Sequence, residues 1–187
     1  MSLLSKLRAD DRVVAVPGGF MSPGIDVASL TLPAYLSIMV NGAAAAVVLD
    51  VTSATSHLTD DESWVFTEIS GVVRRVIYTR NGHIDARQAL SLTYARGGEV
   101  SVGRVTLKVG IVPNVRPGRA YLVFLDQTDD GEWYPSTILF EINRAQRVVD
   151  PARPAVPVPD DQFPDLVMNN ARVDLVLDLI RAELQKN

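Results

Sequence analysis

Apolar and polar residues alternate along most of the chain between residues 43 and 149. Successive side chains of a β-strand point to opposite faces, so this period of two predicts strands that turn one face to a core. The alternating runs are rich in β-branched residues and are separated by turn-forming pairs such as Asn81-Gly82 and Asp130-Gly131. We therefore expect strands at 43–56, 64–79, 89–96, 99–112, 121–125, 132–142 and 147–149.

Glycines break the alternation inside two of these runs. Gly71 lies in the middle of 64–79 and predicts a bulge or tight bend that exchanges the buried face. Gly103 shifts the phase within 99–112, and Gly97-Gly98 is expected to form the turn before that strand. Short strands at near-regular spacing indicate an antiparallel barrel or sandwich.

A charge-free stretch at residues 27–49 is long enough to cross a bilayer. Pro33 and the pair Asn41-Gly42 divide it into shorter pieces. We therefore interpret it as a helix at 33–40 followed by a buried strand, and not as a membrane or export segment. Proline suits the first turn of a helix, where its missing N–H needs no partner.

The pattern changes again at residue 151. Prolines are frequent in 151–168, which predicts an extended tether. Residues 169–187 have a helical period, with Asn169 or Asn170 as the N-cap. The apolar stripe of this helix consists of Val173, Val176, Leu177, Ile180 and Leu184. We expect the helix to pack on its own domain, and the alternative is a free helix that binds a partner.

Together these segments predict a mainly β protein: an antiparallel β-barrel or sandwich with a short N-terminal helix and a C-terminal amphipathic helix. With 187 residues, of which 47% are hydrophobic, the chain is large enough for one such core. The expected parts are an N-terminal segment with the short helix (1–42), the barrel (43–150), the tether (151–168) and the C-terminal helix packed on the barrel (169–187).

Charge is unevenly distributed, although the net charge is only −4. Residues 71–120 contain nine Lys or Arg residues and two acidic residues, whereas the segments before and after are acidic. This basic block is either a binding face, or it is neutralised by the acidic flanks that pack around it. The candidate binding face consists of Arg74, Arg75, Arg80, Arg96, Arg104 and Lys108.

No residue pattern points to catalysis or to a cofactor. The chain has no cysteine, which excludes disulfides, thiolate metal ligands and a Cys nucleophile. His57 and His83 stand in or beside expected turns without the ligand spacing of a zinc or iron site, so we expect no metal. Glu68 has no matched acid or base nearby, and we expect it to pair with Arg74, Arg75 or a backbone amide. We expect no enzyme activity, no catalytic residue and no cofactor.

Five segments between residues 34 and 150 carry a resemblance to known proteins. They read AAAAVVLDVTSATS, TEISGVVRRVIYT, ARGGEVSVGRVTLKVG, PNVRPGRAYLVFL and LFEINRAQRVV. Their layout, with a Gly-Gly turn, a Pro-Gly-x-x-Tyr-Leu strand and a closing Phe-containing hairpin, resembles a widespread group of uncharacterised bacterial proteins, most of them exported. The same core is similar to the netrin-like and tissue-inhibitor-of-metalloproteinase OB-type barrels.

The resemblance implies that the fold is an OB-like antiparallel β-barrel. It also implies an extracytoplasmic location, periplasmic or secreted. The opening MSL is then expected to stand where a native export signal was removed. Metalloproteinase inhibitors of the netrin-like class act through an N-terminal cysteine, which this chain lacks, so the resemblance carries no inhibitory mechanism over. In a closed barrel, both faces of the strand after Pro117-Gly118 are buried, and Tyr121 is a core residue.

Two functions follow as hypotheses. The first is a non-catalytic binding or interaction module whose partner is a protein or a surface polymer. The alternative is a single-stranded nucleic-acid-binding OB domain that uses the basic 71–120 region, with Tyr78, Tyr94 and Tyr121 as stacking platforms. The acidic total argues against a nucleic acid partner, so we favour the first. We expect no transmembrane segment, and the oligomeric state is left open.

Overall fold

The computed structural model describes residues 2–6, 13–16, 30–80, 82–113, 115–137, 139–149, 153–154 and 167–186. Its elements in chain order are a 3₁₀-helix (Leu4–Lys6), β1 (Val13–Val16), α1 (Leu32–Gly42), β2 (Ala45–Leu58), β3 (Val65–Thr79), β4 (Ala89–Tyr94), β5 (Gly97–Val102), β6 (Val105–Val112), β7 (Ala120–Gln127), β8 (Trp133–Pro135), β9 (Phe140–Ile142), β10 (Val148–Val149), β11 (Arg153–Pro154) and α2 (Val173–Leu184). Asn81 and most of the expected tether 151–168 lie outside the described residues. The protein is mainly β, as its alternating pattern predicts.

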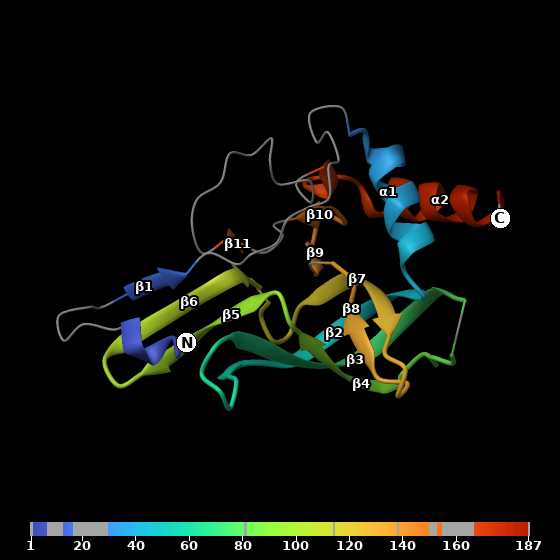
Figure 1. The fold of residues 1–187 in the computed structure, drawn as a ribbon. Coiled ribbons are helices and arrows are strands. Elements are labelled where there is room, and N and C mark those ends of the chain that lie inside the picture. The colour runs from blue at the N-terminus through green and yellow to red at the C-terminus, as the bar shows by residue number, and fades with distance from the viewer. Residues whose placement is uncertain are drawn as a thin grey trace.

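The larger sheet has seven strands and is antiparallel throughout (Figure 1). Its order is β10-β9-β7-β2-β3-β4, and the long β2–β3 hairpin forms its centre. The outer edge of β7 is shared by two short strands: β9 pairs with Ala120–Leu122, and β8 pairs with Leu125–Gln127. The expected single strand at 132–142 is therefore two strands, because the chain turns away after Pro135.

No hydrogen-bonded ladder closes this sheet into a barrel within the described part of the chain. β8 lies against β4, but the two strands do not pair. β8, which would have to pair with β4 to close the sheet, is only three residues long, and its Pro135 has no N–H to donate. The expected closed barrel is therefore not found, and what the structure shows is an open, mainly antiparallel sheet.

The smaller sheet is built on β6. β5 pairs with one part of β6 as a hairpin, β1 pairs with it in parallel, and β11 pairs with it antiparallel. The expectation of one continuous strand at 99–112 is wrong, because Gly103 takes a φ of +62° in a turn that folds β5 back against β6. The pair Gly97-Gly98 belongs to β5 and does not form the turn before it.

Close packing between the two sheets requires a glycine at position 98. A Cβ atom on Gly98 would lie 2.7 Å from both Ser56 Oγ and Thr67 Oγ1. These two hydroxyls are 2.9 Å apart, and they bind the backbone of β5: Thr67 donates to the carbonyl of Gly97, and Ser56 accepts from the N–H of Glu99. Glycine therefore lets the small sheet approach the β2–β3 hairpin closely enough for these hydrogen bonds to form.

Bulges in the β2–β3 hairpin decide which side chains of β3 reach the surface. Beside Gly71 the extra residue is Thr52 on β2, so the expected irregularity is present but lies on the partner strand. The exchange of faces occurs later in β3, where Leu49 pairs with Val73 and Val48 pairs with Arg75. Arg74 is the extra residue there, and both Arg74 and Arg75 are exposed.

The two helices pack against each other beside the larger sheet (Figure 1). α1 begins at the expected place, with Pro33 in its first turn and the Thr31 hydroxyl accepting a 3.4 Å hydrogen bond from the N–H of Ala34. The N-cap residue of α2 is Arg172, not Asn169 or Asn170, and its side chain makes no capping hydrogen bond. No helix in the described part of the chain is both long and apolar enough to span a membrane.

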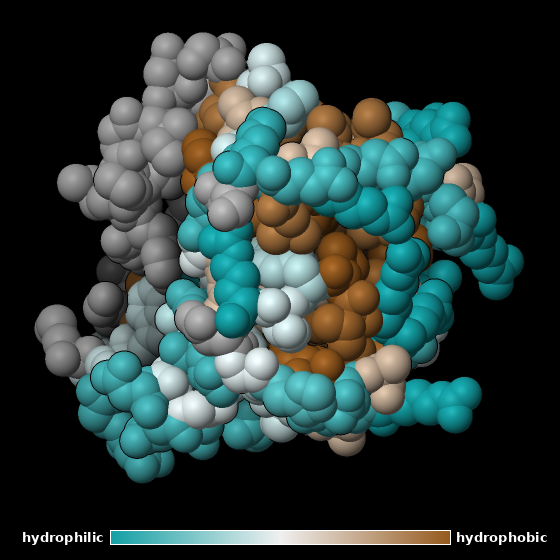
Figure 2. Space-filling model, turned by 90° about the vertical axis from the view of Figure 1, so that its right-hand side faces the viewer, coloured by the Kyte–Doolittle hydropathy of each residue, from teal (hydrophilic) through white to brown (hydrophobic). Residues whose placement is uncertain are grey.

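α2 contributes to the same hydrophobic core as the larger sheet. Val176, Leu177 and Ile180 of the expected stripe are buried, whereas Val173 and Leu184 at its ends are partly exposed. The core also takes both faces of β7, where Tyr121 and Phe124 are fully buried. On the side of the molecule where α2 ends, hydrophobic surface is gathered in one area and framed by hydrophilic side chains (Figure 2).

Candidate binding groove

The six basic residues of the expected binding face are divided between the two sheets. Arg74 and Arg75 lie on β3, and Arg80 follows its end. The other three belong to the smaller sheet and its connections: Arg96 between β4 and β5, Arg104 between β5 and β6, and Lys108 on β6. The charge count along the sequence thus combines residues from two distinct parts of the fold.

At least four of the six interact with other residues of the fold, Arg96 among them. Arg74 forms a forked ion pair with Asp50, with Nη2–Oδ1 at 2.6 Å and Nε–Oδ2 at 3.0 Å. Lys108 pairs with Glu99 at 3.1 Å. The Arg80 guanidinium lies 5.9 Å from the centroid of the Tyr78 ring. These contacts leave less positive charge for a ligand than the sequence suggests.

The tyrosines considered as stacking platforms are core residues. Tyr78 is 8% exposed, and Tyr94 and Tyr121 are fully buried. Burial raises the pKa of Tyr78 to about 12, and its hydroxyl donates to the carbonyl of Val40 at 3.3 Å. No face of these rings is open to a base.

Arg75 instead belongs to a surface groove of about 570 Å³ that the sequence did not predict. We call it the arginine groove. Its walls come from β3, from the turn between β9 and β10, and from the start of α2. It is lined by Arg75, Ala145, Gln146, Arg147, Arg172, Val173, Asp174 and Leu177.

The turn that supplies Arg147 is fixed by Asn143. Its side-chain Oδ1 accepts hydrogen bonds from the N–H groups of Ala145 and Arg147, at 2.9 and 3.0 Å. Gln146 has a φ of +55°, which lets the chain reverse within the turn. The Arg147 side chain donates from Nη1 to the carbonyl of Asn170 at 2.8 Å.

Backbone hydrogen bonds join this turn to the start of α2. Arg147 and Arg172 face each other in an antiparallel bridge. On one side of it the N–H of Val173 donates to the carbonyl of Gln146 at 2.9 Å, and on the other the N–H of Val148 donates to the carbonyl of Ala171 at 2.8 Å. The groove is therefore held in shape by main-chain contacts between segments that are distant in sequence.

The groove carries three positive side chains and one negative side chain. Arg172 forms a forked pair with Asp174, with Nε–Oδ1 at 3.0 Å and a second contact from Nη2 to Oδ2. This hydrogen bonding lowers the pKa of Asp174 and raises the pKa of Arg172. Arg147 contacts only a backbone carbonyl, and Arg75 has no carboxylate partner among the described residues. Two arginines are thus left without a negative counterpart.

Sequence reasoning missed Arg147 and Arg172 because both lie in the acidic segment 121–187. The net charge of that segment is negative, so it gives no sign of the two arginines that the fold places in the same groove as Arg75. One local signal for a basic site is the expected turn at 143–146, which contains Arg144 and is followed directly by Arg147.

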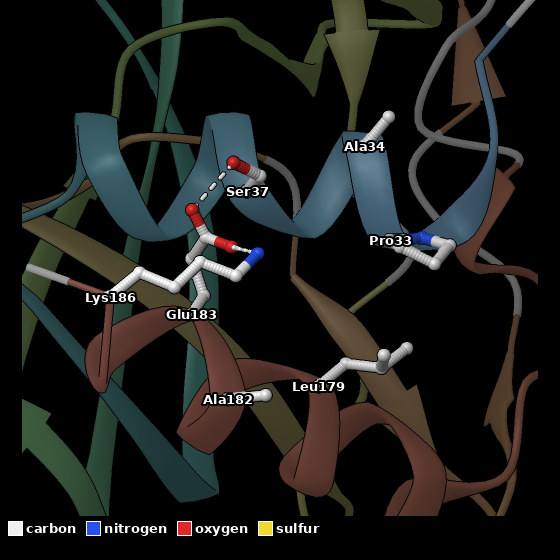
Figure 3. A pocket seen from close by; sticks show the side chains of 7 residues that line it. All are labelled: Pro33, Ala34, Ser37, Leu179, Ala182, Glu183 and Lys186. Carbon is white, nitrogen blue, oxygen red and sulfur yellow. Dashed lines mark hydrogen bonds and ion pairs between the residues drawn. The ribbon is translucent and has the colours of Figure 1, made fainter.

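A second, smaller groove of about 240 Å³ lies between α1 and α2 (Figure 3). Glu183 points from α2 toward α1, where it accepts hydrogen bonds from Ser37 Oγ at 2.7 Å and Asn41 Nδ2 at 3.1 Å. It also pairs with Lys186 at 2.7 Å. The hydrogen bond from Lys186, followed by that from Ser37, lowers the pKa of Glu183 to about 2. Because these polar groups bind one another, they hold the two helices together and are not a candidate ligand site.

The described residues contain no cluster of side chains typical of a metal site. No group of three or more His, Asp or Glu side chains is placed to hold a metal ion there. Glu68 is exposed, and its Oε2 lies 3.1 Å from Nε2 of His57, so it does not pair with Arg74 or Arg75 as expected. The arginine groove is the best candidate for a functional site. Comparisons with protein-family models and with curated proteins give no match for this chain.

Proposed function

We propose that the protein is a non-catalytic binding module and that its partner, a protein or a surface polymer, docks anionic groups in the arginine groove. The single observation that carries this proposal is the pair of arginines, Arg75 and Arg147, that open into one groove without a negative counterpart. Hydrogen bonds between a guanidinium and an anionic group are about twice as strong as neutral ones. A partner that neutralises these arginines therefore gains affinity that the fold itself does not use.

The alternative, single-stranded nucleic acid, has less support. Such partners are bound by stacking on aromatic side chains above a basic groove. None of the residues that line the arginine groove is aromatic, and Tyr78, Tyr94 and Tyr121 are buried. A polyanion recognised by charge without base stacking fits the groove better.

We propose further that the larger sheet is an open relative of the OB-type barrel, which is the relationship implied by the resemblance to netrin-like domains. Support comes from the antiparallel order β7-β2-β3-β4, the bulged β2–β3 hairpin and the approach of β8 to β4. The extracytoplasmic location belongs to the same proposal.

The test is a binding titration with three polyanions at low salt: poly-glutamate, a sulfated polysaccharide and a single-stranded oligonucleotide. We expect at least one to bind, with an affinity that falls as salt is added. The variants R75Q and R147Q should each weaken that binding by about tenfold, which is the loss of one charge-assisted contact. R104Q is the matched control, since Arg104 is exposed but does not line the groove. Binding that R75Q and R147Q leave unchanged would overturn the proposal.

A further inference from the structure

We infer that the ligand of the arginine groove is an acidic peptide segment with aliphatic side chains, and that Asp174 competes with this ligand from within the groove. The inference rests on the proposed function and specifies the partner and its regulation. It follows from three properties of the groove: the aliphatic side chains in its lining, the free amide side chain of Gln146 and the carboxylate that the groove already contains.

Part of the lining of the groove is aliphatic. Val173 and Leu177 lie one turn apart on α2, and Ala145 belongs to the β9–β10 turn. An aliphatic side chain of a ligand gains free energy by covering such a surface, at roughly 25 cal/mol per Å². Neither an inorganic anion nor a highly sulfated polymer has an apolar group to place there. A peptide that alternates acidic and aliphatic residues has both.

Gln146 adds a group suited to a peptide backbone. Its exposed side chain lines the groove and is not engaged by another described residue. An amide side chain has donors and an acceptor, so it can satisfy the C=O and the N–H of an extended peptide together. A volume of about 570 Å³ is also in the range of sites that hold a ligand of a few residues.

Asp174 shows how a carboxylate is held in this groove. It binds Arg172 through both oxygens, which is the forked geometry that a ligand glutamate or aspartate would adopt on Arg75 or Arg147. While this pair is closed, Arg172 is not available to a ligand, and the negative charge of Asp174 repels an incoming carboxylate. Removing that charge should therefore strengthen binding.

The variant D174N tests the competition, and D178N is its matched control. Asp178 lies one turn further along the exposed side of α2, pairs with Arg181 at 2.7 Å and does not line the groove. Both variants make the same change in total charge on the same helix. Circular dichroism and thermal melting establish that each variant is folded.

The probe is a fluorescein-labelled peptide of alternating Glu and Leu, read by fluorescence anisotropy with the full chain at low salt. Two control peptides alternate Gln with Leu and Glu with Ser. We expect the Glu–Leu peptide to bind most tightly, R75Q to weaken it by about tenfold, and D174N to strengthen it by about three- to tenfold. D178N should match the wild type within about twofold.

The results separate this inference from the proposed function. If D174N and D178N bind the Glu–Leu peptide equally, or if the Glu–Ser peptide binds as well as the Glu–Leu peptide, the inference is wrong. The same holds if the sulfated polysaccharide or the oligonucleotide shows Arg75-dependent binding and the Glu–Leu peptide does not, although the proposed function then stands. If no probe shows Arg75-dependent binding, the proposed function itself is wrong.

Discussion

The phenolic oxygen of Tyr121 accepts a hydrogen bond of 2.8 Å from the backbone N–H of Arg116. The ring of Tyr121 is fully buried in β7, so this bond ties the loop before the strand to the core. The loop turns at Gly118, whose φ is +77° and whose N–H donates to the carbonyl of Val51 on β2. The Pro-Gly-x-x-Tyr sequence is thus a local device that fixes where β7 begins.

Replacing Tyr121 by phenylalanine tests this device. Y121F keeps the ring but leaves the N–H of Arg116 without its acceptor, so the free energy of unfolding should fall by about 1–2 kcal/mol. Denaturant unfolding of Y121F and the wild type measures the difference. An unchanged midpoint would show that water replaces the hydroxyl without cost. Because burial is the main cause that raises the pKa of Tyr121, the hydroxyl remains neutral in this assay at neutral pH.

The contact of Glu183 with α1 should make stability depend on acid pH. The pKa of Glu183 is about 2 in the folded protein, against an ordinary value of 4.5. Its contribution is therefore fully present above about pH 4.5 and is lost as the pH falls toward 2. We expect E183Q to melt below the wild type at neutral pH and the gap in Tm to shrink between pH 4.5 and 2. S37A keeps the carboxylate and loses one donor, so it should show a smaller gap. Parallel Tm curves for wild type and E183Q would contradict this role of Glu183.

The close contact between β5 and the β2–β3 hairpin should not tolerate a side chain at position 98. G98A places a methyl group 2.7 Å from two hydroxyls and 2.8 Å from Val65 Cγ1, and the resulting overpacking should cost about 1–3 kcal/mol. G42A is the control, since a Cβ on Gly42 meets nothing within 4 Å. Thermal melting should show a lower Tm for G98A alone. Equal values for both variants would mean that β5 can move away from the hairpin without loss.

The packing of α2 can be tested within that one helix. Ile180 is fully buried and Leu175 is 48% exposed. I180A should therefore reduce the free energy of unfolding by about 2–5 kcal/mol, whereas L175A should cost much less. If the two variants unfold at the same denaturant concentration, α2 does not belong to the core.

Local patterns in the sequence predict much of this fold. The strands β2, β3, β4 and β7 and both helices fall where the periodicity places them, because the spacing of apolar residues depends on which face of an element is buried. The turn at Gly103 was predicted as a phase shift within one strand. A bulge at a glycine inside a strand and a hairpin turn at a glycine both shift the alternation of apolar and polar residues, so the sequence does not distinguish them. Closure of a barrel also could not be decided, because it depends on whether a three-residue strand pairs across a gap.

The candidate site was the least predictable part. Arg75 was among the residues expected to bind a partner, but the other two arginines of the groove, Arg147 and Arg172, were not. Arg74 and Arg75 look equivalent in sequence, yet a bulge and the position of Asp50 give Arg74 a partner and leave Arg75 to the groove. Arg147 and Arg172 join it only through the ladder between the β9–β10 turn and the start of α2. Contacts of this range have no periodic signature in a single sequence.

The hydrogen bond between Ser37 and Glu183 joins residues 146 positions apart. During synthesis it therefore forms only after almost the whole chain has been made. A ribosome adds about 5–20 residues per second, so α1 emerges roughly 7–30 s before the helix that packs against it. The β2–β3 hairpin is local and can form during that time. Until α2 emerges, the side of α1 that it covers is exposed on the nascent chain, and apolar surface exposed in this way favours aggregation.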